Sequence, residues 1–116
     1  MKVLVTGDRN WANKDVIKRE LARLPEGTIL VHGACRGADT LAARSAYELG
    51  MESVTYPADW TKDGKAAGPI RNQKMLDMEK PDLVLAFHEN IESSKGTRDM
   101  MERAEKAGLE VLLFTE

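Results

Sequence analysis

Hydrophobic and polar residues alternate along the chain in a pattern typical of parallel α/β proteins. Short apolar runs at 3–6, 28–31, 53–56, 83–87 and 111–114 predict five buried strands. Amphipathic segments at about 14–24, 38–49, 69–79 and 97–107 predict four helices between and after them. Because short strands alternate with helices, we predict one parallel sheet with helices on both faces, a three-layer α/β/α domain.

The residues at the ends of these segments support the boundaries. Asn13 is suited to cap the first helix, and Pro69 suits the first position of the third. Gly50 and Gly108 directly follow the second and fourth predicted helices, at the position where a residue in the left-handed conformation commonly ends a helix. The positions expected to face the core are Ile17, Leu21, Leu24, Leu41, Ala42, Ser45, Leu49, Met75, Met78, Met100, Met101, Ala104 and Ala107.

One long segment, 58–68, has no apolar period and is predicted to be irregular. Loops of this length are uncommon in small domains and are often functional. In parallel sheets, ligands bind outside the carboxyl ends of the strands. The candidate site is therefore expected in the four segments that follow strands, at 7–9, 33–39, 58–68 and 88–96.

Composition narrows the class of protein. The 116 residues fit a single domain, 1–116, and the net charge of −2 disfavours a strongly basic nucleic-acid surface. No apolar run is long enough to span a membrane and no signal peptide is evident, so we expect a cytoplasmic protein. One cysteine forms no internal disulfide. No spacing of His, Cys and carboxylates suggests a metal site, and we expect no cofactor.

The segment 33–39 carries the clearest candidate chemistry. Gly33 and Gly37 let the backbone approach a ligand, and the helix that follows offers N–H groups to an anion. Arg36 can pair with a phosphate and Asp39 can accept from a ribose hydroxyl. The alternative is a tight turn in which Asp39 only complements the helix dipole. The spacing matches neither the dinucleotide fingerprint nor a P-loop.

Other candidates have weaker signals. Gly96 and Thr97, after two serines and a lysine, could cradle phosphate, although simple capping by Thr97 or Ser94 is slightly favoured. Arg71 and Asn72 are placed at the start of the third helix, where the dipole opposes a cation, which favours an anionic partner for Arg71. Asp59 and Trp60 could do no more than pin the loop, Trp60 could also stack on a base, and Trp11 has the same two alternatives. Cys35 is expected to fill the turn rather than to act as a nucleophile.

Four segments, 6–9, 32–39, 57–72 and 96–100, together resemble the YspA-like, cpYpsA-related family of the SLOG superfamily, found in bacteria and phages. The resemblance implies a Rossmann-like sheet of order 3-2-1-4-5 and a pocket for a nucleoside phosphate or an ADP-ribose-like molecule. The ligand-binding residues that it and the motifs imply are Gly7, Asp8, Arg9, Gly33, Arg36, Gly37, Asp39, Asp59, Trp60, Arg71, Asn72, Gly96 and Thr97. Asp8 and Asp39 would accept from ribose hydroxyls.

The resemblance leaves two alternatives to a pure binding function. One is a phosphoribohydrolase of the LOG type, with Arg71 and Asp99 as catalytic candidates. The catalytic Glu of that pattern falls on Met100, and Asp99 lies about 100° away around the helix, so that geometry is not reproduced. The other is a single-stranded nucleic-acid module, which the net charge disfavours. The expected partner is a nucleotide-derived small molecule, with no membrane contact; a homo-oligomer is compatible with the sequence.

Overall fold

The computed structural model describes residues 1–116, which form a five-stranded sheet of order β3-β2-β1-β4-β5. All four strand pairs are parallel, as the sequence predicts. The central strand β1 pairs with β2 through Val3 and Leu30, and with β4 through Val3 and Leu83. The strands are β1 (Lys2–Gly7), β2 (Ile29–His32), β3 (Glu52–Thr55), β4 (Leu83–Phe87) and β5 (Glu110–Phe114).

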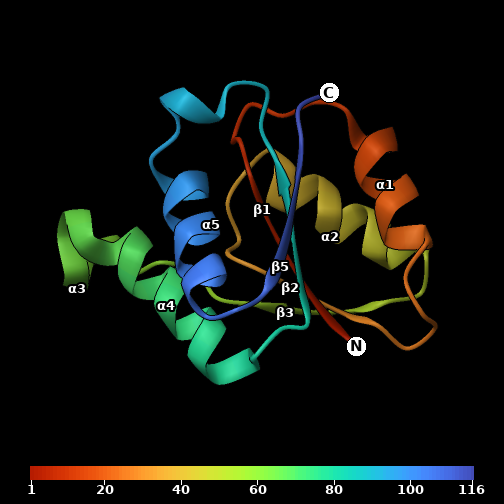
Figure 1. The fold of residues 1–116 in the computed structure, drawn as a ribbon, viewed down its shortest axis with the longest axis horizontal. Coiled ribbons are helices and arrows are strands. Elements are labelled where there is room, and N and C mark those ends of the chain that lie inside the picture. Colours follow the sequence, from red (N-terminus) through yellow and green to blue (C-terminus); the bar gives the residue numbers. More distant parts are fainter.

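Four helices of nine residues or more cover the sheet, two on each face (Figure 1). They are α1 (Lys14–Ala22) and α2 (Ala38–Glu48) on one face, and α4 (Ala67–Glu79) and α5 (Gly96–Lys106) on the other. The chain adds strands outward from β1 to β3 and then returns to place β4 beside β1. The reversal of strand order therefore lies between β1 and β4, where ligands of such sheets commonly bind. None of the helices combines the length and the apolar composition that crossing a bilayer requires.

Each face of the sheet has its own apolar core. Under α1 and α2, Val3, Val5 and Phe87 pack with Ile17 and Leu21, all almost fully buried. Under α4 and α5, the core comprises Leu4, Val31, Val84, Met75, Leu76, Met100 and Ala104. Successive β1 residues point to opposite faces, which explains why the part of β1 that is buried on both sides, Val3 to Val5, is apolar at every position.

The segment predicted to be irregular, 58–68, is instead mostly helical. One turn, α3 (Trp60–Asp63), is followed by the 3-10 turn η1 (Gly64–Ala66) and then directly by α4. Asp59 begins this segment, because its carboxylate accepts from the Lys62 backbone N–H at 3.1 Å. Arg71 is consequently the fifth residue of α4 and not its opening residue. The prediction that Arg71 lies in the first turn is therefore wrong, and the helix dipole gives no reason to expect an anionic partner for it.

Five predicted core positions also need correction, one of them Met101, which is only partly buried and belongs to neither core. Leu24 lies beyond the end of α1 and is only partly buried, although it still packs against the first core. Leu49 is 36% exposed and Met78 is 64% exposed. Ala107 is exposed as well. Leu49 and Ala107 are the C-cap residues of α2 and α5, where the helical period stops applying. A second 3-10 turn, η2 (Ile91–Ser93), occupies part of the predicted loop after β4.

Candidate functional site

A hollow of about 530 Å³ opens at the carboxyl ends of β2 and β3, next to the loop that follows β1. We call it the carboxyl-edge cleft. It is formed by the loops after these strands together with α3 and the start of α4. Its lining residues are Arg9, Gly33, Ala34, Cys35, Arg36, Pro57, Ala58, Trp60 and Arg71. Five of the thirteen predicted ligand-binding residues therefore line the cleft: Arg9, Gly33, Arg36, Trp60 and Arg71.

The β2–α2 loop owes its shape to Asp39. One carboxylate oxygen, Oδ2, accepts from the backbone N–H groups of Gly33 at 3.1 Å and Cys35 at 3.2 Å. Ala34 between them has a φ of 59°, a left-handed conformation that is uncommon for alanine. The side chain of Asp39 thus holds the loop from inside, in the manner of the tight turn that was the alternative expectation. Its role as a ribose acceptor is not supported by this arrangement, because the carboxylate is buried.

Burial raises the pKa of Asp39 to about 6, although the backbone N–H of Cys35 and the charge of Arg71 act to lower it. The folded state therefore binds this proton more tightly than the unfolded chain, and the group makes folding less favourable as pH rises through 6. We expect the unfolding free energy of the wild type, relative to an Asp39→Asn variant, to increase by about 1 kcal/mol between pH 7 and pH 5. Urea unfolding of both proteins at each pH measures this difference. A difference that is flat or falls on acidification would contradict it.

The β2–α2 loop packs directly on the loop after β1. The Ala38 backbone N–H donates to the Asp8 carbonyl at 3.1 Å. Gly37 has a φ of 77°, and a Cβ on it would collide with the carbonyl of Asp8 and the backbone of Arg9. Gly7 is similarly confined, since a Cβ there would lie 2.5 Å from the Phe87 carbonyl oxygen. These close approaches place Arg9 and Arg36 on adjoining loops.

Arg71 reaches across from α4 and ties two of the loops together. Its Nη1 donates to the Gly33 carbonyl at 2.6 Å and to the Tyr56 carbonyl at 3.3 Å. Its Nε donates to Asn72 Oδ1 at 3.0 Å, and both terminal nitrogens lie 3.8 Å from Cys35 Sγ. A Cβ on Gly33 would collide with the guanidinium. Arg71 therefore forms a fixed wall of the cleft, with Nη2 as its least committed donor.

Arg9 and Arg36 differ from Arg71 because nothing in the structure engages them. Both are exposed, both line the cleft, and neither guanidinium has a hydrogen bond or an ion pair. Trp60 lines the same cleft and is 57% exposed. Trp11, the other tryptophan, is 5% exposed and packs near Phe87, so its role is in the core. Asp59 caps α3 and also accepts from Thr61 Oγ1 at 2.7 Å.

The start of α5 is near the cleft but does not line it. Ser94 Oγ accepts from the Thr97 backbone N–H at 3.1 Å, which is the capping alternative. Asn72, almost fully buried, donates to the Gly96 carbonyl at 3.4 Å and to Asp99 Oδ2 at 3.0 Å. The same Asp99 oxygen accepts from Arg103 Nε at 2.9 Å. Asn72 and Asp99 therefore join α4 to α5 in this structure.

Sequence reasoning gave no role to the two histidines, which end β2 and follow β4. His32 Nδ1 accepts from the Ala34 backbone N–H, and His88 Nδ1 accepts from the Asn90 backbone N–H, both at 3.0 Å. The pKa of His32 is lowered by burial and by the charge of Arg71, and its Nε2 has no partner. His88 Nε2 lies 4.0 Å from Asp8 Oδ2. In the sequence, the two histidines share a position at the end of a strand. Each precedes by two residues the loop residue whose backbone N–H it accepts.

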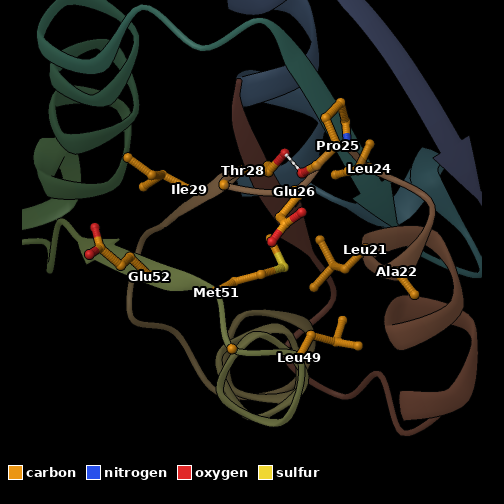
Figure 2. A pocket seen from close by; sticks show the side chains of 12 residues that line it. Leu21, Ala22, Leu24, Pro25, Glu26, Thr28, Ile29, Leu49, Met51 and Glu52 are labelled. Carbon is orange, nitrogen blue, oxygen red and sulfur yellow. Dashed lines mark hydrogen bonds between the residues drawn. The ribbon is translucent and has the colours of Figure 1, made fainter.

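A second hollow, of about 570 Å³, lies at the opposite edge, where α1 and α2 end and β2 and β3 begin (Figure 2). Figure 2 shows Leu21, Leu49 and Met51 along it, with Thr28 Oγ1 donating to the Pro25 carbonyl at 2.6 Å. Its lining includes Glu26 and Glu52 but no lysine or arginine. Although larger, it is the poorer site for an anion, because of these two hollows the carboxyl-edge cleft is the one lined by arginines.

Comparison with known proteins bears on the family and the fold of this chain. A DNA processing protein A (DprA) structure from Streptococcus pneumoniae matches 97% of this chain and 49% of its own, with a TM-score of 0.80 and 19% identity, which indicates a shared fold. The Gene 61 protein of Mycobacterium phage D29 is 41% identical over 122 residues, covering 97% of this chain and 95% of that protein. The family model for YspA, the cpYpsA-related SLOG family, matches residues 1–62. The chain therefore belongs to the YspA, cpYpsA-related SLOG family and has its Rossmann-like fold.

Proposed function

We propose that this protein binds a nucleotide or nucleotide-derived ligand, a nucleoside phosphate or an ADP-ribose-like molecule, in the carboxyl-edge cleft. The observation that carries the proposal is the pair of unengaged arginines, Arg9 and Arg36, on two loops in direct contact. Guanidinium groups pair with phosphate oxygens through parallel hydrogen bonds. Two of them lining one hollow, in a protein whose net charge is −2, form a local anion site.

The rest of the cleft suits the other parts of a nucleotide. Trp60 presents an exposed ring on which a base can stack. Arg71 forms a fixed wall of the cleft. Its Nη2 is a donor that does not bond a backbone carbonyl. A hollow of about 530 Å³ is within the size range of small-ligand sites. The family membership and the position at strand carboxyl ends support the same assignment.

A nucleotide panel tests the proposal. We expect at least one of AMP, ADP and ADP-ribose to raise the melting temperature of the protein and to change the fluorescence of Trp60. An Arg9→Ala, Arg36→Ala double variant is expected to bind that ligand about tenfold to a thousandfold more weakly, since each charge-assisted contact is typically worth roughly 1.5–3 kcal/mol before losses to solvent.

Arg44→Ala is the control for the double variant and removes one positive charge where the double variant removes two. Arg44 is exposed on α2, has no ion pair, and does not line the cleft. Its removal changes the net charge without touching the site, so the control is expected to bind like the wild type. Equal weakening by Arg44→Ala would show that only overall charge matters. No binding by any member of the panel would overturn the proposed function.

A further inference from the structure

The pair formed by Asp8 and His88 occupies the point between β1 and β4 where the strand order reverses. Gly7 and Phe87 are register partners, and the Asp8 backbone N–H donates to the Phe87 carbonyl at 2.9 Å. The sheet therefore fixes the backbones of Asp8 and His88 relative to one another. Neither lines the carboxyl-edge cleft, but Asp8 directly precedes Arg9, which does.

The tautomer of His88 follows from its hydrogen bonds. Nδ1 accepts from the Asn90 N–H, so the proton of the neutral ring is on Nε2. That N–H lies beside Asp8 Oδ2, 4.0 Å away, which is too long for a direct hydrogen bond. Asp8 Oδ1 is already used, because it accepts from the Asn10 N–H at 2.9 Å. The pair thus consists of one free donor and one free acceptor.

The spacing between them fits one hydroxyl group. Two hydrogen bonds of about 2.8 Å meeting at one oxygen join atoms that are roughly 4–4.6 Å apart. A hydroxyl can accept from His88 Nε2–H and donate to Asp8 Oδ2 at once, whereas a hydrogen atom in its place satisfies neither. The side chains are 25% exposed for Asp8 and 10% for His88, so solvent reaches the pair.

We infer that Asp8 and His88 together recognise a ribose hydroxyl, so that this protein selects ribonucleotide ligands over their deoxy counterparts. The inference rests on the proposed function and names the sugar class of that ligand, held by a pair that lies beside the cleft lining and not in it. It also distinguishes two carboxylates that the sequence treats alike. The Asp39 carboxylate accepts from two backbone N–H groups inside the loop, whereas Asp8 has one carboxylate oxygen without a hydrogen bond. Asp8 and His88 are specificity-determining residues, with no covalent step assigned to them.

The test compares ADP with 2′-deoxy-ADP and 3′-deoxy-ADP by calorimetric titration. We expect one deoxy form to bind the wild type about ten- to a hundredfold more weakly than ADP, as loss of a hydrogen bond to a charged group implies. Asp8→Asn replaces the free acceptor by a donor of the same shape. In this variant the affinities for ADP and for the two deoxy forms are expected to agree within about threefold.

Two substitutions of His88 separate recognition from loop structure. His88→Asn keeps an acceptor near the Nδ1 position for the Asn90 N–H but has no group at Nε2, so it is expected to lose selectivity. His88→Gln places an amide N–H near Nε2 and is expected to retain part of it. A purely structural role would change stability without moving the ratio of ADP to deoxy-ADP affinities.

The outcomes distinguish this inference from the proposed function. Equal binding of ADP and both deoxy forms by the wild type would overturn the inference alone. Selectivity that persists unchanged in Asp8→Asn and His88→Asn would overturn it as well. If ADP and every other ribonucleotide in the panel fail to bind, the proposed function falls and this inference falls with it.

Discussion

Replacing Gly37 by alanine is expected to lower the unfolding free energy by about 2–5 kcal/mol and to abolish ligand binding in the carboxyl-edge cleft. Two costs add at this position. Its φ of 77° penalises any residue with a Cβ, and the new Cβ would collide with the backbone of Asp8 and Arg9. Backbone atoms cannot rotate away as a flexible side chain can. The two arginine-bearing loops would have to separate.

Gly50→Ala is the matched control, because Gly50 has a similar φ of 73° but nothing within 4 Å of a built Cβ. It is expected to cost only about 1–2 kcal/mol, the conformational part alone, and to leave binding intact. Chemical denaturation of both variants measures the difference. Equal destabilisation by the two substitutions would show that the contact between the loops contributes nothing.

An Arg71→Ala variant is expected to lose about ten- to a hundredfold in nucleotide affinity and about 1.5–3 kcal/mol of stability. The reason is positional. Arg71 Nη1 holds the carbonyls of Gly33 and Tyr56, so its removal loosens two walls of the cleft in addition to deleting a cation. Arg71→Lys is expected to recover little, since a lysine ammonium cannot bond the carbonyls and Asn72 in the same planar arrangement.

In contrast to the Arg71 variants, Asp99→Asn is expected to leave nucleotide affinity nearly unchanged, and it also tests whether the protein cleaves the nucleotide. Asp99 binds Asn72 and Arg103 in the link between α4 and α5, outside the lining of the cleft. We therefore expect this variant to bind nucleotide within about threefold of the wild type, the change expected when no direct contact is lost. Chromatography of the incubated nucleotide accompanies the titration. Base released by the wild type and not by Asp99→Asn would replace simple binding with N-glycosidic cleavage.

The sequence predicted the sheet and its helices because each strand and helix is specified locally. β4, predicted at 83–87, is observed at Leu83–Phe87, since an apolar run flanked by Pro81 and His88 has few alternatives. The predicted element boundaries were wrong in the segment 58–68, which was expected to be irregular. Asp59 caps α3 within the predicted loop. α4 begins at Ala67, two residues before Pro69, so Arg71 lies in its second turn.

Which polar residues remain free for a ligand was decided by the tertiary structure alone. Asp8 directly follows β1, and Asp39 lies in the first turn of α2, after the glycine-containing loop that follows β2. The Asp39 carboxylate is buried against two loop N–H groups, whereas Asp8 has one oxygen free beside His88. Arg36 and Arg71 are both predicted from the sequence to bind an anion, but only Arg71 finds backbone carbonyls within reach. Residue type and spacing place a group at the edge of the sheet. Its remaining donors and acceptors depend on neighbours that are distant in sequence, because hydrogen bonds are satisfied in three dimensions.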